Sequence, residues 1–447
     1  MFRSASAGQP LRTWHCFAGT PPAPLERPPY DTAFGDDNHG YCLEPAFGRS
    51  AGWSAVASDG SAAITVGSVQ TQEGAVLGLI RRWNERGRPD RHFGHTGDRL
   101  EAFGFGEARA SRAVMDRESR HLFVAGHSWR SFPNAIGLTR IDARTGAADV
   151  GFGTDGIVQV SVGNHRGPFD VTEVDAFAWD PATRRLFLSF YATDVEEVEH
   201  SGILCRNADG TVGSDFGPDG LFAVETMSPA APFQHLAVDS RSRLVAAGTL
   251  RLKDGTALVV SRMRTDGEPD PDFGSDGKVF FKGLPRVRAA SVQVDREDRI
   301  LVVGDTQDPT SIRRELFALR LDLRGLVDPS FGAAGWFRGR FAGFGIQSSA
   351  ASTAATLDSE GRLLVTGESD TLREPGWIGL LRLTADGLHD TSFAGLGTAR
   401  FDLHRHRHWI GSRSVTTDAT GRILLAGLVQ DLPQSDSEGL LLRAVDR

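Results

Sequence analysis

Residues 270–280 read DPDFGSDGKVF, and variants of this phrase recur along the whole chain. The phenylalanines of the phrase lie at Phe34, Phe93, Phe152, Phe216, Phe273, Phe331 and Phe393, at intervals of 59, 59, 64, 57, 58 and 62 residues. A fixed period of this order is typical of a propeller, a solenoid or an array. The chain therefore contains seven copies of one unit.

Each unit contains four short apolar segments, named A to D here in chain order. Segment A follows the phrase, as at 277–281 (GKVFF), and segment B alternates in hydropathy, as at 290–295 (ASVQVD). Segment C is the most apolar, as at 300–304 (ILVVG), and segment D carries an arginine near its end, as at 317–321 (FALRL). Their lengths and residue types favour strands over helices.

Seven units of four strands predict an all-β fold, a seven-bladed β-propeller with four-stranded blades around a central channel. An open β-solenoid would need far shorter coils per repeat. We expect an N-terminal extension over residues 1–30 and one propeller domain over residues 31–447. The first phrase has no segment D before it, and the chain stops four residues after Arg443. We therefore expect the terminal segments to close the ring, with Asp31 beside Arg443.

The phrase DxxFGxxG, the apolar segment ending in Ala-Gly and the arginine before an Asp-Gly turn together resemble the delta-60 repeat, which occurs in tandem in bacterial proteins. The resemblance covers the chain from about Asp31 to Arg447. It implies a propeller of tandem repeats and almost nothing about activity. Members are largely uncharacterised and often exported, whereas this chain shows no signal sequence.

Composition gives broad limits on function. The net charge of −8 provides no basic surface for nucleic acid, and no apolar run has the length of a signal peptide or a membrane span. We expect a soluble monomer without a membrane partner, cytoplasmic by default, with an extracellular location left open. Three cysteines are too few for a disulfide framework, although Cys16 could pair with Cys42 after export.

Two charged pairs recur with the repeat. The first joins the arginine of segment D to the aspartate that opens the next phrase, eight or nine residues later. The arginines are Arg82, Arg140, Arg206, Arg262, Arg320, Arg382 and Arg443, and the aspartates within the chain are Asp90, Asp149, Asp270, Asp328 and Asp390. Gly213 replaces the aspartate after Arg206. We expect this pair to fasten a linker between blades, while the phenylalanine packs between them and the glycine permits the turn.

The second pair lies at the turn from segment B to segment C. Its members are Asp116 and Arg120, Asp180 and Arg184, Asp239 and Arg243, Asp295 and Arg299, Asp358 and Arg362, and Asp418 and Arg422. The aspartate can accept N–H groups of its own turn, and the arginine can neutralise it. Because a catalytic site needs one unique arrangement, both repeated pairs indicate a structural role.

Alternate connections in a blade emerge on opposite faces of the ring. The B–C and D–A connections are near-copies of one another, whereas the A–B and C–D loops differ in length and chemistry. Dissimilar loops on a rigid scaffold are typical of a binding surface. We therefore predict that a ligand binds on the A–B/C–D face, with Trp129, His165, Arg373, Trp377 and Trp409 as candidate contacts. Burial between blades is the alternative for the tryptophans, and the one we favour.

Metal binding has one candidate in the sequence. His404, His406 and His408 alternate in HRHRH, so extended backbone would place three imidazoles on one side, as a zinc site requires. A solvated loop edge is the alternative. Acidic residues near the phrase suggest calcium, but the regular DxDxDG ladder is missing, and no cofactor is expected otherwise. The GxSxG at 48–52 lacks the strand, elbow and helix of a hydrolase nucleophile.

Three classes of function fit the sequence. The preferred one is a non-enzymatic propeller that binds a protein or a carbohydrate through the A–B/C–D face. An enzyme of hydrolase or lyase type, with a pocket at the channel mouth, is the second. A structural module of a larger assembly is the third. Converging acid and base groups would indicate an enzyme, and an exposed aromatic and polar patch would indicate a binding protein.

Overall fold

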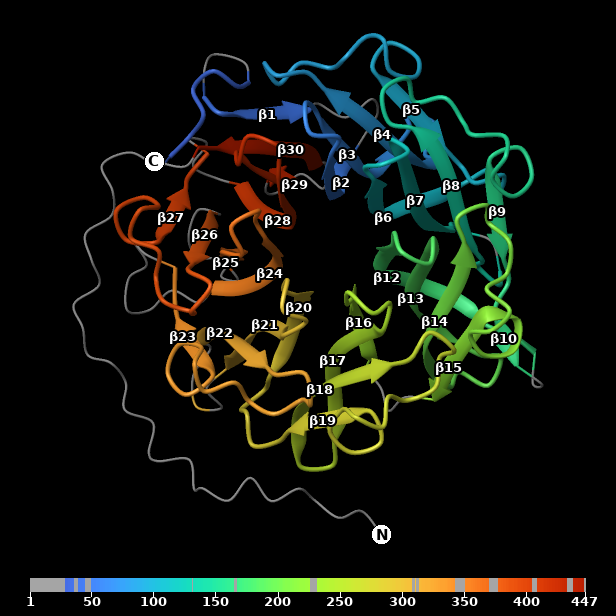
Figure 1. Cartoon of the computed structure of the whole chain (residues 1–447). Coiled ribbons are helices and arrows are strands. Elements are labelled where there is room, and N and C mark those ends of the chain that lie inside the picture. Colours follow the sequence, from blue (N-terminus) through green and yellow to red (C-terminus); the bar gives the residue numbers. More distant parts are fainter. Residues whose placement is uncertain are drawn as a thin grey trace.

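The computed structural model describes residues 29–35, 39–44, 50–130, 132–164, 167–225, 231–307, 310, 313–341, 350–369, 377–403, 408–431 and 437–445. They form seven four-stranded antiparallel sheets, arranged as blades around a central channel (Figure 1). A two-stranded hairpin, β10 (Gly163–Asn164) with β11 (Gly167–Pro168), and a short 3-10 turn, η2 (Pro218–Gly220), lie outside the blades. The seven-bladed all-β propeller predicted from the repeat is confirmed.

The two inner strands of each blade come from segments B and C. The innermost strands, in blade order, are β2 (Ser50–Ser58), β6 (Ala108–Asp116), β12 (Asp170–Asp180), β16 (Ala231–Val238), β20 (Arg288–Val294), β24 (Ala350–Leu357) and β28 (His408–Thr417). The second strands are β3 (Ala63–Gln70), β7 (His121–Ser128), β13 (Arg185–Thr193), β17 (Leu244–Leu252), β21 (Ile300–Gln307), β25 (Leu363–Ser369) and β29 (Ile423–Asp431).

The two outer strands come from segments D and A. The third strands are β4 (Val76–Trp83), β8 (Ile136–Asp142), β14 (Glu199–Asn207), β18 (Gly255–Met263), β22 (Arg314–Leu321), β26 (Ile378–Leu383) and β30 (Ser437–Ala444). The outermost strands are β5 (Asp98–Glu101), β9 (Ile157–Val160), β15 (Leu221–Glu225), β19 (Lys278–Phe281), β23 (Trp336–Gly339), β27 (Thr398–Phe401) and β1 (Tyr41–Glu44).

The blade boundaries differ from the expectation that the phrase links two blades. Segment A pairs with segment D of the preceding unit, as where Leu100 of β5 lies opposite Leu79 of β4. The phrase therefore connects the third and outermost strands of one blade, and the chain crosses to the next blade after segment A. A short connection favours pairing of the two antiparallel strands that it joins.

The ring closes through the two ends of the described chain. β1 supplies the outermost strand of the seventh blade by pairing with β30, with Tyr41 opposite Leu442. The Asp31 N–H donates to the Arg443 carbonyl at 3.0 Å, and Arg443 Nε lies 2.7 Å from Asp31 Oδ2. The predicted closure, with Asp31 beside Arg443, is confirmed.

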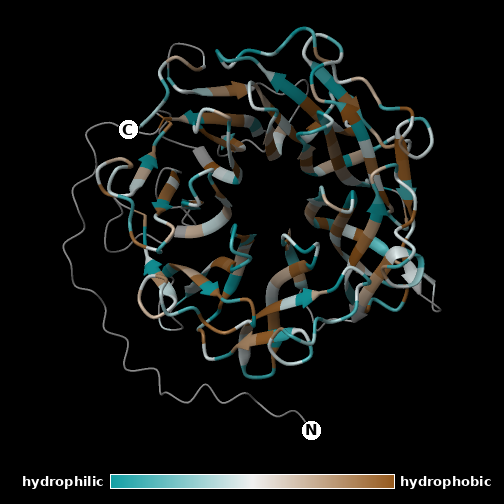
Figure 2. Ribbon diagram, in the orientation of Figure 1, coloured by the Kyte–Doolittle hydropathy of each residue, from teal (hydrophilic) through white to brown (hydrophobic). Residues whose placement is uncertain are grey.

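The hydrophobic core consists of layers between neighbouring blades. One such layer joins Phe123 and Leu138 of the second blade to Val171 and Leu188 of the third. Apolar residues concentrate in the strands, whereas the connections are mainly hydrophilic (Figure 2). Among the described residues, no helix is long and apolar enough to cross a membrane.

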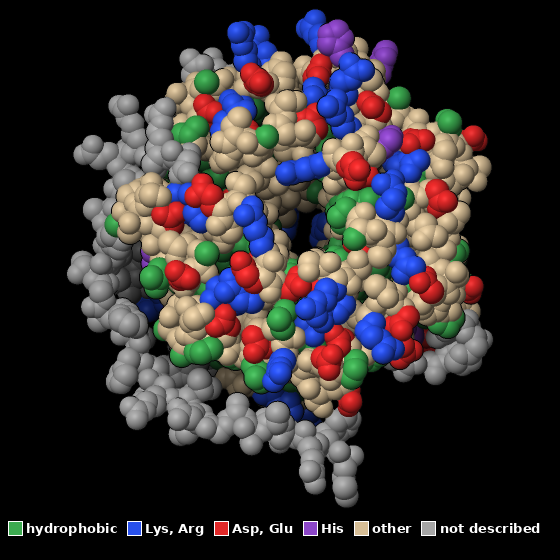
Figure 3. All heavy atoms as spheres, viewed as in Figure 1, with side chains coloured by type: hydrophobic (Ala, Val, Ile, Leu, Met, Phe, Trp, Pro, Cys, Tyr) green, Lys and Arg blue, Asp and Glu red, His purple; other side chains and the backbone are tan. Residues whose placement is uncertain are grey.

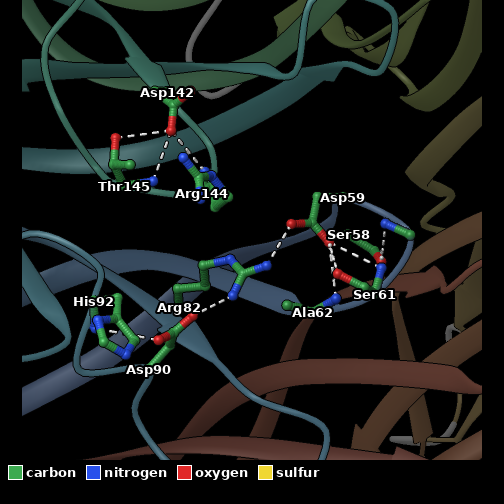
Figure 4. Close-up of polar contacts among 11 residues, drawn as sticks. Ser58, Asp59, Ser61, Ala62, Arg82, Asp90, His92, Asp142, Arg144 and Thr145 are labelled. Carbon is green, nitrogen blue, oxygen red and sulfur yellow. Dashed lines mark hydrogen bonds and ion pairs between the residues drawn. The ribbon is translucent and has the colours of Figure 1, made fainter.

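The charged pair of the phrase forms as predicted, although within one blade. Arg262 Nε lies 2.7 Å from Asp270 Oδ2, and the Arg262 guanidinium stacks 4.7 Å from the centre of the buried Phe273 ring. Equivalent ion pairs form at Arg82, Arg140, Arg320, Arg382 and Arg443. In the first blade Arg82 also bonds Asp59 of the inner hairpin, so one guanidinium bridges two turns (Figure 4). Arg206, which has no aspartate, donates instead to the carbonyls of Cys205 at 2.8 Å and Asp219 at 3.3 Å.

The pair at the B–C turn forms in only four of the six predicted blades. Asp239–Arg243, Asp295–Arg299, Asp358–Arg362 and Asp418–Arg422 lie within 2.6 to 2.8 Å. The prediction is wrong for Asp116 with Arg120 and for Asp180 with Arg184. In those two blades the aspartate pairs with the residue five positions later, so the arginine lies in the turn with a positive φ. Hydroxyls of Ser119 and Thr183 bond the two aspartates instead.

Candidate functional site

Four of the eight predicted metal and ligand residues lie outside the described part of the chain. This holds for His165, Arg373, His404 and His406. His408 and Trp409 begin β28, opposite Asp431 and Gln430, but their side chains are not among those described. Within the described ranges, no three His, Cys, Asp or Glu side chains are grouped to hold a metal.

The described tryptophans of the A–B/C–D loops differ in burial. Trp129 is half-buried at the end of β7, with the Arg109 guanidinium 3.5 Å from its ring centre. Trp377 is fully buried, its ring centre 6.4 Å from that of Phe341, so it offers no surface to a ligand. Trp53 is buried as well. Trp377 is therefore not a candidate ligand contact. It packs in the core, which is the alternative that we favoured for the tryptophans.

Every innermost strand carries an irregularity of register against the second strand. In five blades the residue before the irregularity pairs with a glycine, namely Gly67, Gly126, Gly304, Gly367 or Gly427. A Cβ on Gly304 would lie 2.2 Å from the Arg288 carbonyl, so only glycine permits this approach of the two strands. These bulges form a ring at one height around the channel, which we call the bulge ring.

Side chains of the bulge ring differ from blade to blade. The residues within the irregularities include Ser54, Ser111, Asp175, Gln234, Ala290, Thr353 and Arg413, and Arg112 and His235 end two of them. Bulges redirect side chains and are frequent beside functional sites. Arg112, Asp175, His235 and Arg413 therefore lie at structurally equivalent positions of four blades.

Arg112 is held by backbone carbonyls. Its Nε donates to the Asp175 carbonyl at 2.6 Å, and its Nη1 donates to the Ser111 carbonyl at 2.9 Å. Burial lowers the pKa of the guanidinium, the carboxylates of Asp175 and Glu173 oppose that shift, and Arg413 adds to it. Arg112 belongs to the second blade and Arg413 to the seventh, so their mutual influence acts across the channel.

Asp175 is a partly buried carboxyl beside this cation. Its Oδ2 is shielded from solvent and has no hydrogen-bond partner in the described structure. Burial, reinforced by the charge of Glu173 and opposed by that of Arg112, raises the pKa of Asp175 to about 8. Asp175 is therefore mainly protonated at neutral pH and can donate a hydrogen bond.

His235, in the fourth blade, shows the opposite shift. Burial lowers its pKa to about 4, with further lowering by Arg112 and Arg288, while a hydrogen bond with the Ala289 backbone opposes the shift. The imidazole is therefore neutral at physiological pH. The nearby Arg288 is already engaged, because its Nη2 lies 2.7 Å from Asp305 Oδ2 and donates to the Ser352 carbonyl at 2.6 Å.

One face of the molecule is hollowed at its centre (Figure 3). Figure 3 shows a hollow at the centre of the ring, with lysine or arginine side chains at its rim and within it. The channel thus combines a cation, a protonated carboxyl and a neutral imidazole from three blades. A signal for this site is present in the sequence. Arg112, Asp175 and His235 occupy nearly equivalent positions of segment B in three repeats, where the fifth repeat has Ser291.

Comparisons with known proteins identify no close relative. No family model matches the chain, and no curated protein matches it, so membership of the delta-60 repeat family stays a prediction. Among solved structures, the chain is similar to the propeller domain of the Trilobed protease from Pyrococcus furiosus, with 10% identity over 89% of this chain and 94% of that one, and a TM-score of 0.46. It is also similar to an acylaminoacyl peptidase of Pyrococcus horikoshii, with 12% identity and a TM-score of 0.45. That match covers 87% of this chain and 52% of the peptidase chain. A polysaccharide lyase, an ulvan lyase, matches with 8% identity, 90% and 96% coverage and a TM-score of 0.42.

Proposed function

We propose that this propeller binds a carbohydrate at the A–B/C–D end of its channel. The observation that carries the proposal is that Arg112, Asp175 and His235 lie at equivalent register irregularities of three neighbouring blades, with Arg112 bonded to the Asp175 carbonyl. The repeated arginines and aspartates on the opposite face are, by contrast, engaged in ion pairs of the scaffold. Selective recognition needs unique groups, and the repeated ion pairs of that opposite face do not supply them.

The distribution of exposed apolar side chains favours a carbohydrate over a protein partner. A protein interface needs a central cluster of apolar or aromatic anchors. Among the described residues, only Phe132 and Val195 are large exposed hydrophobics in A–B or C–D loops. The channel presents hydroxyls and charged groups instead, which suit a polyhydroxylated ligand. Trp129, stacked on Arg109 beside the second blade, adds an aromatic surface.

A binding screen tests this function. The full chain would be passed over immobilised neutral and acidic oligosaccharides, and the bound glycans titrated by calorimetry. We expect Trp129→Ala to weaken binding about tenfold, while Phe280→Ala, an exposed aromatic on the outermost strand β19, leaves it unchanged. Absence of any glycan binding, or an affinity that survives Trp129→Ala and the loss of the channel charges, would refute the proposal.

A second candidate function is an enzyme of hydrolase or lyase type in the same channel. It is favoured by Asp175 and His235, whose pKa values are displaced in opposite directions to about 8 and about 4. Such displaced pairs are frequent among acid and base catalysts. Incubating each bound glycan with the protein and separating the products by chromatography distinguishes the two functions, because a binding protein leaves the glycan intact.

A further inference from the structure

We propose that the ligand of the channel is a sugar acid whose carboxylate is held at the bulge ring by Arg112 and Asp175. This inference rests on the proposed carbohydrate function and adds the chemical group that is recognised.

Among the described residues, Arg112 has no anionic partner. Its Nε and Nη1 donate to backbone carbonyls, and neither Asp175 nor Glu173 forms an ion pair with it within the 4.0 Å limit of such a pair. Arg288, close to the same channel, is paired with Asp305, and the joint arginine Arg262 is paired with Asp270. A partly buried charge is normally paired, so the Nη2 side of Arg112 suits an anion from outside the chain.

Asp175 supplies a second donor for the same anion. The Asp175 carbonyl fixes the Arg112 guanidinium at 2.6 Å, which keeps the two residues side by side. Asp175 is only partly buried, and its carboxyl oxygen Oδ2 has no hydrogen-bond partner in the described part of the chain. A protonated carboxyl donates an O–H, and a carboxylate accepts through two oxygens, so guanidinium and carboxyl together match one carboxylate group.

The surrounding charges favour an anion. Arg109, Arg112 and Arg413 are cationic, and Asp175 and His235 are neutral near pH 7. Three arginines near one neutral carboxyl therefore suit a carboxylate, whose two oxygens can accept from the guanidinium and from Asp175 together. Because interactions in a partly desolvated channel are strong, an uncharged sugar would lose most of this stabilisation.

The direction of approach follows from the order of residues on β6. Arg109 lies three positions nearer the A–B end of the strand than Arg112, and Trp129 stacks on it. A sugar entering from the A–B/C–D face would therefore meet the Arg109–Trp129 pair first and place its carboxylate deeper, beside Arg112. In this arrangement Arg109 and Trp129 contact the sugar ring, and the bulge ring binds the carboxylate.

Calorimetry on the full chain at pH 6.5 and constant ionic strength tests the inference, with galacturonate, galactose and inorganic phosphate as probes. We expect galacturonate to bind at least tenfold more tightly than galactose or phosphate. Arg112→Gln should lower the ratio of galacturonate affinity to galactose affinity at least tenfold. Arg241→Gln makes the same chemical change at an exposed B–C turn and should retain it. Circular dichroism confirms that each variant is folded.

A second variant keeps the test decisive if Arg112→Gln does not fold. Asp175→Asn retains a hydrogen-bond donor and should bind galacturonate within about threefold of wild type, while Asp175→Leu should lose the preference for it. Equal affinity for galacturonate and galactose, or tighter binding of phosphate, overturns the sugar acid. If neutral glycans still bind in a manner that depends on Trp129, the proposed function stands while this inference fails. If no glycan binds, both fail.

Discussion

The arginines of this protein lie at two kinds of site, and their contacts distinguish the two. Arginines of the joints lie against aspartates and phenylalanine rings, so their charges are satisfied within the scaffold. Arg112 is held by carbonyls alone, and the adjoining Asp175 and His235 respond to burial by taking their neutral forms. The two kinds of site use the same residue types, so only the contacts distinguish them.

The neutral forms of Asp175 and His235 make stability depend on pH. The pKa of Asp175 rises from 3.8 to about 8 on folding, so its contribution is complete below about pH 4 and is lost as pH rises to about 8. The pKa of His235 falls from 6.5 to about 4, so its contribution is complete above about pH 6.5 and is lost as pH falls to about 4. The two slopes oppose each other between about pH 4 and 6.5, and only that of Asp175 remains between about 6.5 and 8.

We therefore expect Asp175→Asn to flatten the pH dependence of stability above pH 6.5. Wild type should lose at most about 1.4 kcal/mol per pH unit through this group between pH 6.5 and 8. Burial is the largest cause of both pKa shifts, and the charged groups that modify them are Glu173 and Arg112 for Asp175, and Arg112 and Arg288 for His235. Urea unfolding at several pH values measures the slope. The same slope in wild type and variant would show that Asp175 is ionised in the folded protein.

At the scale of strands and turns, the repeat predicts much of the fold because its signals are local. Phe273, its glycine and the arginine of segment D recur at one period, and each marks a turn or a strand end. The blade boundary is not local, because the four residues of a segment A strand such as β19 carry no hydropathy signal that selects a partner strand. The bulge ring was missed for a related reason. A bulge depends on register against a second strand, which the sequence of one strand does not reveal.

The B–C turns provide a prediction at this scale. Arg362→Ala removes the 2.6 Å pair with Asp358 and should lower the free energy of unfolding by about 1 to 3 kcal/mol, because a buried carboxylate loses its partner. Arg120→Ala should change it by less than about 0.5 kcal/mol, since Arg120 is exposed in a longer turn and Asp116 bonds Ser119 instead. Equilibrium denaturation compares the two variants, and similar losses would mean that Arg120 does pair with Asp116 in solution.

For the whole molecule, the ring depends on one joint that is not continuous in the chain. Asp31 and Arg443 reproduce there the contacts of Asp270 and Arg262, including the guanidinium over a phenylalanine, with Arg443 4.2 Å from the Phe34 ring centre. We expect Asp31→Ala and Asp270→Ala to lower the free energy of unfolding by a similar amount, about 3 to 5 kcal/mol.

Hydrogen exchange separates the two variants. Asp31→Ala should speed exchange of the β30 amides that pair with β1, because β1 can separate without opening the rest of the blade. Asp270→Ala should leave the β30 amides protected. It should also leave the β18 amides that pair with β19 protected, because the continuous chain keeps these two strands together. Unchanged protection of β30 in the Asp31 variant would show that β1 is held by its strand pairing alone.

The antiparallel pairing of β1 with β30 also determines how the molecule responds to force. Tyr41 lies opposite Leu442 and Glu44 opposite Gly439, so the chain enters β1 at the same edge where it leaves β30. A load between Tyr30 and Val445 would separate the strands from that edge, one hydrogen bond after another, in the manner of a zipper. Strands pulled from opposite edges would instead share the load in shear. The propeller is therefore mechanically weak along this one direction, however stable its seven blades are in solution.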